Sequence, residues 1–539
     1  MRAGLADARE DHDRFLALIK EETRSKRQGL LAGTLAAIAA LVAMIGLRAV
    51  TGIVSLLDIL ADGLLLALPI SVFSTILGLF GKQAKTFLLI GLMLAIVLIG
   101  AWCGRMMAKG APLKAGPGLL WARAIAWSMG LFAVATAFAA LYTLGRMPDV
   151  AAGLGVVRIA ACILGAMTAF AVVLGGVLQL LRTEAPPVRA AVSPDSASGA
   201  SAPTMDRRRV VTRAGLALAT LGGLAVLGRE VARIANRTIV GGRHGTMPPA
   251  ITPNSEFYLI SKNFVDPSPD RGDDWSLDIG GLVKNRITLT AKDLQPLAGP
   301  VFVSTLTCIS NPIAGPLIGT AEWTGVPLAT VLSLAGVMNG AVKVVGEGED
   351  GYTDAIPIER AMSAEPHIVW KMNGEPLPPK HGTPVRLIVP GLYGIKNVKW
   401  LTSLTVTADD YQGYWQQRGW TDTAIIKTSS RIDVPGDRAV ISSRPTEIGG
   451  IAFAGDRGIA KVEVSTDGGE TWQEATIAEN PSPEGLSWVL WTLPWNPASG
   501  AYTLVVRAMD GTGALQTSDS APELPDGASG WHRITVGVA

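Results

Sequence analysis

Five long stretches without a charged residue lie in the first 181 residues and limit what this part of the chain can fold into. Each has 17 to 23 residues, and they cover residues 29–47, 64–80, 86–102, 124–144 and 159–181. An apolar helix of this length crosses a hydrocarbon layer of about 30 Å. Burying five such helices in water would need a core larger than this chain can wrap. The sequence therefore predicts an N-terminal all-α transmembrane bundle of about five helices over residues 29–181.

A basic segment precedes the predicted bundle, and a second one follows it. Residues 1–28 hold seven Lys and Arg residues, so the positive-inside rule places this N-terminal segment in the cytoplasm. Residues 182–206 are rich in Pro, Ser and Ala, which indicates a flexible linker. Three arginines at 207–209 then precede an apolar run at 214–228. Residues 207–228 therefore resemble a twin-arginine export signal with its helix, and an ordinary cytoplasmic anchor is the alternative.

The charge pattern leaves the number of membrane crossings open. Five crossings would put the arginines at 207–209 on the side opposite to residues 1–28, although both segments are basic enough for the cytoplasm. A sixth crossing could use the short apolar stretch at 50–60. Alternatively, one of the five windows does not cross. Charge counting alone does not decide between five and six crossings before the signal-like helix.

Composition excludes several classes of site and partner. Lys and Arg exceed Asp and Glu by only 47 − 45 = 2 residues, and no basic stripe suited to nucleic acid occurs. Three cysteines, Cys103, Cys162 and Cys308, are too few for a disulfide framework or a Cys-rich zinc or iron–sulfur site. No histidine lies between His12 and His244, so the membrane helices lack the imidazole pair that holds a membrane haem. We therefore expect no haem.

From about residue 252 the pattern changes to short alternating strands, such as 275–279 and 385–389, separated by Gly, Pro and Asp turns. This pattern indicates a soluble α+β region that is rich in strands. Cys308 is the only cysteine of this region and comes directly after an apolar strand. A cysteine in such a place is more often a small buried filler than a ligand, so its surroundings must decide.

The surroundings of Cys308 carry a family pattern. Residues 304–332, STLTCISNPIAGPLIGTAEWTGVPLATVL, place a strand-end cysteine ahead of an A-x-W-x-G-x-x-L run. This stretch resembles the molybdenum-binding segment of the sulfite oxidase family. The resemblance continues through four further motifs in the family's order: DGYTDAIP at 350–357, MNGEPLP at 372–378, HGTPVRLIVPG at 381–391 and GIKNVKWL at 394–401. Several ordered motifs are a much stronger signal than any one of them alone.

The resemblance implies a cofactor and residues that bind it. Residues 245–425 would form an α+β domain that holds molybdenum-molybdopterin, with Cys308 as the metal ligand. A thiolate suits oxidised molybdenum, and the phosphate of the cofactor calls for fixed guanidinium and ammonium donors. Without the motifs, such cations would be taken for solvated surface charges. The implied cofactor-binding residues are Tyr258, Cys308, His381, Arg386, Lys396, Asn397, Val398 and Lys399.

The resemblance also assigns a second domain and two catalytic cations. Residues 431–539 look like the family's immunoglobulin-like sandwich, which often forms a dimer interface, so a homodimer is expected. Within it, an Asp-Gly-Gly turn at 467–469 is predicted to join two strands. Lys262 and Arg457 are implied to polarise the substrate oxygen beside Cys308. For Arg457 an exposed loop charge is the alternative, since loop arginines are usually solvated.

The chain departs from the family at the residues that would bind substrate. Sulfite oxidases follow the cysteine with Ala-Gly-Asn-Arg-Arg, whereas this chain has Ile309, Ser310, Asn311 and Pro312. The catalytic tyrosine of the family aligns with Trp420, and an indole cannot replace a phenol as acid or acceptor. The chain therefore lacks the arginine clamp for a sulfite dianion, and we expect it to be a poor sulfite oxidase.

Two functions of different classes follow from these observations. The leading one is a molybdopterin-dependent oxidoreductase anchored in the bacterial cytoplasmic membrane, with its catalytic domain on the periplasmic side. It would transfer an oxygen atom and two electrons on a small sulfur or nitrogen oxide, by sulfoxide or N-oxide reduction or by sulfite-type oxidation. It would exchange electrons with an external partner such as a cytochrome or a quinone-linked protein. The alternative is a non-catalytic envelope binding protein, for which Cys308 and the phosphate donors would be unnecessary.

Overall fold

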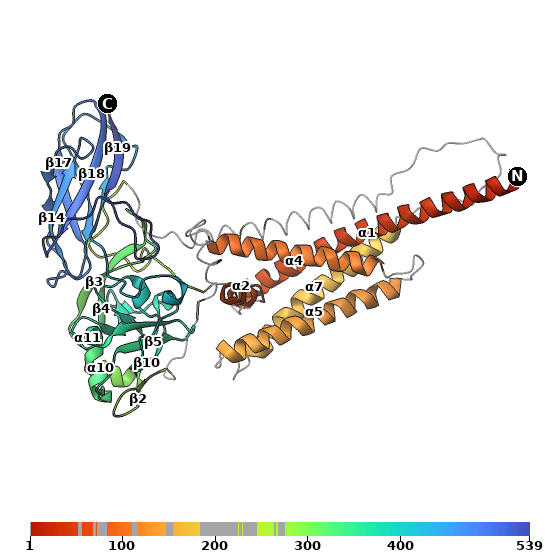
Figure 1. Cartoon of the computed structure of the whole chain (residues 1–539), viewed down its shortest axis with the longest axis horizontal. Coiled ribbons are helices and arrows are strands. Elements are labelled where there is room, and N and C mark those ends of the chain that lie inside the picture. Colours follow the sequence, from red (N-terminus) through yellow and green to blue (C-terminus); the bar gives the residue numbers. More distant parts are fainter. Residues whose placement is uncertain are drawn as a thin grey trace. The chain divides into compact units, whose positions relative to one another are not determined.

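The computed structural model describes most of the chain in two compact units, one built of helices and one built mainly of strands (Figure 1). The positions of the two units relative to each other are not determined. The described residues are 2–51, 56–67, 84–109, 117–146, 155–183, 245–263, 266–267 and 275–539, with the single residues Val72, Ala225 and Arg229.

Long apolar helices make up the N-terminal unit. Its described helices are α1 (Arg2–Thr51), α2 (Leu56–Ala67), α4 (Ala84–Lys109), α5 (Pro117–Arg146) and α7 (Gly155–Thr183). In the described part of the chain, four stretches are long and apolar enough to cross a membrane: Glu22–Leu47, Thr86–Ala108, Gly118–Ala137 and Ile159–Gln179.

These four stretches overlap four of the five windows expected from the sequence. The first begins before residue 29 because α1 continues through the basic N-terminal segment, where Lys26 and Glu22 form an ion pair of 2.6 Å one helical turn apart. The remaining window, 64–80, lies outside the described residues except for the end of α2 and Val72. The twin-arginine-like segment at 207–228 lies outside them except for Ala225.

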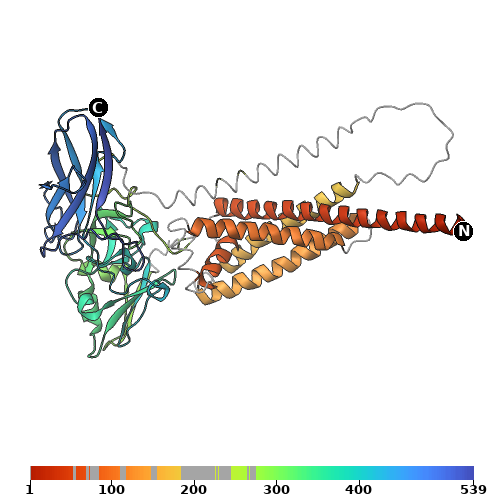
Figure 2. The ribbon, with the colours of Figure 1, turned by 45° about the horizontal axis from the view of Figure 1, so that its top comes forward.

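Small residues bring the helices of this unit close together. Helix α1 packs against α4 and α7, and Figure 2 shows the red α1 beside the orange α4. A Cβ atom placed on Gly33 would lie 2.0 Å from the carbonyl oxygen of Gly100, so only glycine permits this approach. Trp121 Nε1 donates to Gln179 Oε1 at 2.9 Å and links α5 to α7. Tight backbone packing, with few polar contacts, is the pattern expected in lipid.

Two sheets form the first half of the strand-rich unit. The first has the order β2-β1-β10-β5-β6 and pairs antiparallel except between β1 and β10. Its strands are β1 (Ser276–Gly281), β2 (Ile287–Thr290), β5 (Lys343–Gly348), β6 (Thr353–Pro357) and β10 (Leu401–Thr407). The second has the order β3-β4-β7-β8, with β9 paired to β7. Its strands are β3 (Phe302–Thr307), β4 (Ile318–Pro327), β7 (His367–Met372), β8 (Glu375–Pro376) and β9 (Arg386–Ile388).

Short helices cover and connect these sheets. They are α9 (Ala291–Leu294), η3 (Gln295–Leu297), α10 (Leu328–Ala335), α11 (Ile358–Ala361), η4 (Pro379–His381), η5 (Gly394–Lys396) and η6 (Gln416–Arg418). Helix α10 buries Leu328, Val331, Leu332 and Ala335, which share one face by the 3.6-residue period. These side chains join Trp275, Leu404 and other buried residues of the first sheet in one apolar core. The loops at the strand ends are not part of this core, and they form the site.

Two packed sheets form the C-terminal half. One has the order β11-β13-β17-β16 and the other β12-β19-β18-β14-β15. A shared apolar core joins their facing sides and includes Ile448 and Trp491 from the first sheet and Val462 and Val506 from the second. The strands are β11 (Ser429–Val434), β12 (Val440–Ile441), β13 (Thr446–Phe453), β14 (Ile459–Ser465), β15 (Gln473–Glu474), β16 (Thr476–Ile477), β17 (Val489–Trp495), β18 (Gly500–Asp510) and β19 (His532–Val538).

The predicted Asp-Gly-Gly turn is confirmed, because β14 and β15 pair antiparallel on either side of it. The side chain of Asp467 accepts the backbone N–H groups of Glu470 and Thr471 and so closes the turn. Several hydrogen bonds join this half to the first one. Thr305 N donates to Leu486 O at 3.0 Å, and Arg431 Nη1 donates to Gly315 O at 3.0 Å.

Candidate cofactor and active site

An open cavity lies beside Cys308 at the end of β3 and has about 720 Å³ of empty space, including its mouth. Its walls bring together segments that are far apart in sequence, from residue 257 to residue 415. Among the described residues, four cationic side chains line it, those of Lys262, Lys380, Arg386 and Lys399, against the one acid Asp350. This surplus of 4 − 1 = 3 positive charges suits an anionic ligand.

Backbone hydrogen bonds fix the position of Cys308. Its N–H donates to Leu317 O at 3.0 Å, and its carbonyl accepts the N–H of Asn311 at 3.0 Å. The side chain is 7% exposed, and burial raises the pKa of the thiol. Gly394 lies beside it, and a Cβ atom there would be 3.1 Å from the Tyr258 hydroxyl and 3.8 Å from Cys308 Cα. The glycine therefore keeps the space next to the cysteine open.

Arg386 is a buried guanidinium for which the described residues supply no counter-ion. Its side chain donates to the carbonyl of His381 at 3.0 Å and only weakly, at 3.5 Å, to that of Asn397. Its Nε has no hydrogen-bond partner, and no carboxylate pairs with it within the described residues. Burial lowers the pKa of Arg386 to about 10. A buried cation left in this state is costly, so the geometry calls for an anion at this wall.

The groups around Arg386 are polar and held in place. Burial and the nearby charges of Arg386 and Lys399 lower the pKa of His381 to about 3, so its imidazole is neutral. Lys399 Nζ donates to Ile260 O at 3.0 Å and to Lys380 O at 3.1 Å. These residues form a cationic wall with one neutral imidazole.

Asn397 and Tyr258 shape the wall without adding charge. Asn397 Oδ1 accepts the N–H of Val389 at 2.7 Å, and its Nδ2 donates to Tyr393 O at 3.2 Å. Asn397 therefore holds the loop that carries Gly394. Burial raises the pKa of Tyr258, so its phenol stays protonated beside Cys308.

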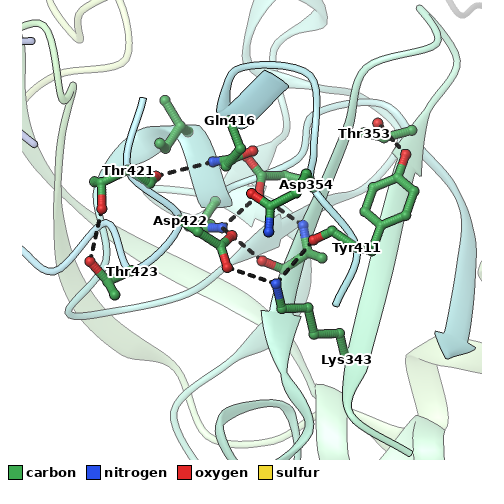
Figure 3. Close-up of polar contacts among 12 residues, drawn as sticks. Lys343, Thr353, Asp354, Tyr411, Gln416, Thr421, Asp422 and Thr423 are labelled. Atoms are coloured by element: carbon green, nitrogen blue, oxygen red, sulfur yellow. Dashed lines mark hydrogen bonds and ion pairs between the residues drawn. The ribbon is translucent and has the colours of Figure 1, made fainter. Parts of the chain in front are cut away.

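Three predicted site residues lie away from the cavity wall, and the first is Lys396. Its Nζ contacts Asp354 Oδ1 at 2.8 Å, Ala355 O at 2.8 Å and Asp422 Oδ1 at 2.9 Å. Its side chain is 1% exposed. Asp422 also pairs with Lys343 at 2.7 Å, as Figure 3 shows. The three donor positions of Lys396 are thus used inside the protein, and none is left for a cofactor phosphate.

The other two are Val398 and Arg457. Val398 is fully buried in the apolar core behind the cavity. Arg457 Nε pairs with Asp510 Oδ2 at 2.8 Å, and its Nη2 donates to Ile426 O at 3.0 Å. The guanidinium lines a different hollow, together with Lys427 and Asp526. The expectation that Arg457 reaches the cavity is therefore not met, because Asp510 holds it elsewhere.

Lys262 does line the cavity, but its charge is already compensated. Its Nζ donates to Asp350 O at 2.8 Å and to Asn263 Oδ1 at 2.7 Å, and it lies 3.6 Å from Asp350 Oδ2. Trp420, which aligns with the expected tyrosine, is buried in a separate apolar cluster.

Sequence reasoning assigned no role to Tyr352, Trp415 or Ser310. Tyr352 and Trp415 line the cavity, and the Tyr352 hydroxyl donates to Ile395 O at 2.6 Å. Ser310 Oγ lies 3.0 Å from Cys308 Sγ. Tyr352 and Ser310 stand inside the quoted motifs, and that position was the available signal. Trp415 lies outside them.

These residues fit a molybdenum-molybdopterin cofactor. The thiol of Cys308 is a soft ligand that faces the cavity, and the partnerless Nε of Arg386 is a donor suited to a phosphate oxygen. The space beside Gly394 adjoins Cys308 and the hydroxyl of Tyr258. A metal ligand, a hydrogen-bond donor for the phosphate and space for the cofactor are therefore present in one cavity.

Comparisons with known proteins agree with this site. Residues 265–415 match the model of the oxidoreductase molybdopterin binding domain, and residues 417–539 match the Mo-co oxidoreductase dimerisation domain. Mitochondrial sulfite oxidase of Mus musculus is 34% identical over 41% of this chain and 47% of its own length. Sulfite oxidase of Gallus gallus is 30% identical over 50% of this chain and 69% of its own length.

The chain thus spans about half the length of the mouse relative. The crystal structure of the sulfane dehydrogenase SoxCD from Paracoccus pantotrophus is also similar, with 23% identity over 53% of this chain and 81% of that chain, and a TM-score of 0.48. The two matched domains, together with the identity and coverage of the chicken relative, show the family. This chain belongs to the sulfite oxidase family of molybdopterin-dependent oxidoreductases.

Proposed function

We propose that the chain holds molybdenum-molybdopterin in the cavity beside Cys308 and transfers an oxygen atom and two electrons on a small neutral sulfur or nitrogen oxide. One observation carries the proposal. Arg386 is buried in the wall of the same cavity that Cys308 lines, and no carboxylate among the described residues pairs with it. A chain that used this fold only for binding would have no reason to retain both an unpaired buried guanidinium and a thiol in the wall of the same cavity.

Each residue has a role set by its chemistry. Cys308 would bind the metal as a thiolate, since thiolates suit soft and redox-active metals. Arg386 would give its free Nε to the cofactor phosphate, with Lys399 adding charge and neutral His381 a hydrogen bond. When bound, the cofactor supplies two-electron oxygen-atom transfer. The phenol of Tyr258 stays protonated by burial and can donate a hydrogen bond toward the space beside Cys308.

The charges near Cys308 favour a neutral substrate. Lys262 is compensated by Asp350, and Arg457 is compensated by Asp510 in a different hollow. The arginines that follow the cysteine in sulfite oxidases are absent. For a sulfoxide the overall reaction is R₂SO + 2 e⁻ + 2 H⁺ → R₂S + H₂O. Lys262 donates two of its three N–H groups to Asp350 O and Asn263 Oδ1, and its third N–H would polarise the oxygen of a neutral substrate in this reaction.

We propose that the enzyme acts at a bacterial membrane, outside the cytoplasm. Four apolar helices support the anchor, and the arginines at 207–209 support export of the folded domain. The two packed sheets support an immunoglobulin-like sandwich, and the dimerisation-domain match supports a homodimer through it. An external carrier such as a cytochrome or a quinone-linked protein would exchange the electrons.

The decisive experiment measures molybdenum and pterin in purified protein, for the wild type and for Cys308→Ser. We expect about one molybdenum per wild-type chain and no turnover in the variant, because a serine hydroxyl is a poor ligand for this metal. Cys162→Ser, in helix α7, is the matched control and should keep both metal and activity. A fully active Cys308→Ser variant would disprove the proposal.

A second experiment tests the substrate class. It compares kcat/KM for sulfite with kcat/KM for dimethyl or methionyl sulfoxide, using an artificial dye as electron partner. Each charge-assisted hydrogen bond missing from an anion site costs about 1.5 to 3 kcal/mol, so two missing arginines should weaken sulfite turnover roughly a hundredfold or more. A large preference for sulfite would show that other cations have replaced the missing pair.

A further inference from the structure

The side chain of Ser310 contacts the sulfur of Cys308. Ser310 Oγ lies 3.0 Å from Sγ, within hydrogen-bond distance. In the sulfite oxidases the stretch after the cysteine carries an arginine pair, which this chain lacks. Here the residue two positions after the cysteine contacts the sulfur instead.

The loop that carries Ser310 is held rigidly. Asn311 Oδ1 accepts the N–H of Leu317 at 2.9 Å and closes the loop on itself. Gly315 packs so tightly that a Cβ atom there would lie 2.3 Å from Asn311 Oδ1. Its carbonyl accepts Arg431 Nη1 at 3.0 Å, which ties the loop to β11. Ser310 is therefore fixed in place before any metal binds.

The direction of the serine hydrogen bond follows from the chemistry of the sulfur. In a free thiol either Sγ or Oγ could be the donor. A metal-bound thiolate has no proton, so the hydroxyl of Ser310 can only donate. Ser310 has no other side-chain partner within the described residues. Its hydrogen bond is therefore fully available to the sulfur.

We propose that Ser310 is a positioning residue that tunes the metal: its hydroxyl donates to the metal-bound sulfur of Cys308 and favours the reduced state of the centre. This inference rests on the proposed function. Reduction places more negative charge on the metal and its sulfur ligand, and a hydrogen bond to that sulfur is stronger when the charge is larger. In the sulfite oxidases the residues after the cysteine carry the arginines that bind the substrate anion. In this chain the same loop would instead tune the reduction potential of the metal.

The test measures the reduction potential of the molybdenum in the complete membrane protein, by a redox titration followed through the Mo(V) resonance. Ser310→Ala should make reduction less favourable by about tenfold in its equilibrium constant, which is about 59 mV for a one-electron step. Ser310→Thr and Ser310→Val form a matched pair of nearly equal shape. Threonine should keep the wild-type potential, and valine should behave like alanine. Ser333→Ala, which removes an exposed hydroxyl from helix α10, is a control that should change nothing.

The outcomes separate the two claims. Wild-type protein without molybdenum overturns both the proposed function and the role of Ser310. Molybdenum at full content together with an unchanged potential in Ser310→Ala and Ser310→Val overturns the role of Ser310 alone. Equal potentials for the threonine and valine variants would assign any shift to shape rather than to the hydrogen bond, and would also overturn it.

Discussion

Arg386 and Lys396 are two buried cations near the same cavity, and they differ in the source of their counter-ion. Lys396 is 1% exposed and contacts two carboxylates, those of Asp354 and Asp422. Arg386 is 5% exposed, donates to carbonyl groups and lies over the ring of Trp323, and no carboxylate of the described residues pairs with it. A buried charge needs a counter-ion, and for Lys396 the chain supplies it. For Arg386 a ligand must supply it, so the contrast separates a residue that supports the fold from one that binds.

Breaking the Lys396 cluster should have the largest effect. Lys396→Met leaves Asp354 buried without a cation and should lower the free energy of unfolding by about 3 to 5 kcal/mol. Asp354 has little tolerance for this loss, because burial already raises the pKa of its carboxyl despite the lysine. The measurement is denaturant unfolding followed by tryptophan fluorescence.

Two further variants sharpen this prediction. Lys371→Met removes an exposed lysine of β7 and should change stability little. The double variant Lys396→Met with Asp354→Leu should recover part of the loss, since an apolar pair can replace a buried ion pair. If Lys396→Met is no less stable than Lys371→Met, the cluster does not support the fold.

Arg386→Met should show the opposite pattern. It removes an unpaired buried charge but leaves two carbonyls without their donor, so the stability of cofactor-free protein should change by only about 1 kcal/mol. Cofactor affinity should fall roughly tenfold to a hundredfold, because one charge-assisted hydrogen bond to the phosphate is lost. Pterin content after dialysis measures this loss.

Arg418→Met is the control for Arg386→Met. Arg418 stacks on Tyr414 outside the set of cavity-lining residues, and its variant should retain pterin. Large destabilisation of Arg386→Met with normal pterin retention would reverse the assignment of the two cations.

Local patterns in the sequence predicted much of the fold. Uncharged windows predicted the helices of the N-terminal unit, and an apolar run predicted the strand that ends at Thr307, before Cys308. The Asp-Gly-Gly turn at 467–469 predicted the β14–β15 hairpin. Each of these features depends on neighbours within a few residues, so sequence alone contains the needed information.

Local patterns could not show which cations of the site face the cavity and which are neutralised inside the protein. Arg386, Lys396 and Lys399 stand in adjacent motifs and look equivalent in sequence. The acids that neutralise Lys396 lie 42 and 26 residues away along the chain. Arg457 was assigned to the cavity by alignment, but Asp510, 53 residues away, holds it elsewhere. Counter-ions depend on tertiary contacts, which the spacing of motifs does not contain.

The smallest effect should be a pH dependence that originates at His381. Its pKa is about 3 in the folded protein, because burial and the uncompensated Arg386 disfavour the imidazolium, and about 6.5 when unfolded. Between these values the unfolded chain binds a proton that the folded protein does not, so stability falls as the pH drops below 6.5. From pH 6.5 to 5.5 the loss should be about 1 kcal/mol for cofactor-free protein. His381→Gln should lack this share of the acid sensitivity.

Inorganic phosphate beside Arg386 would raise the pKa of His381 and weaken the pH dependence in the wild type. Equal slopes of stability against pH for the wild type and His381→Gln would mean that the pKa of His381 is not lowered in the folded protein.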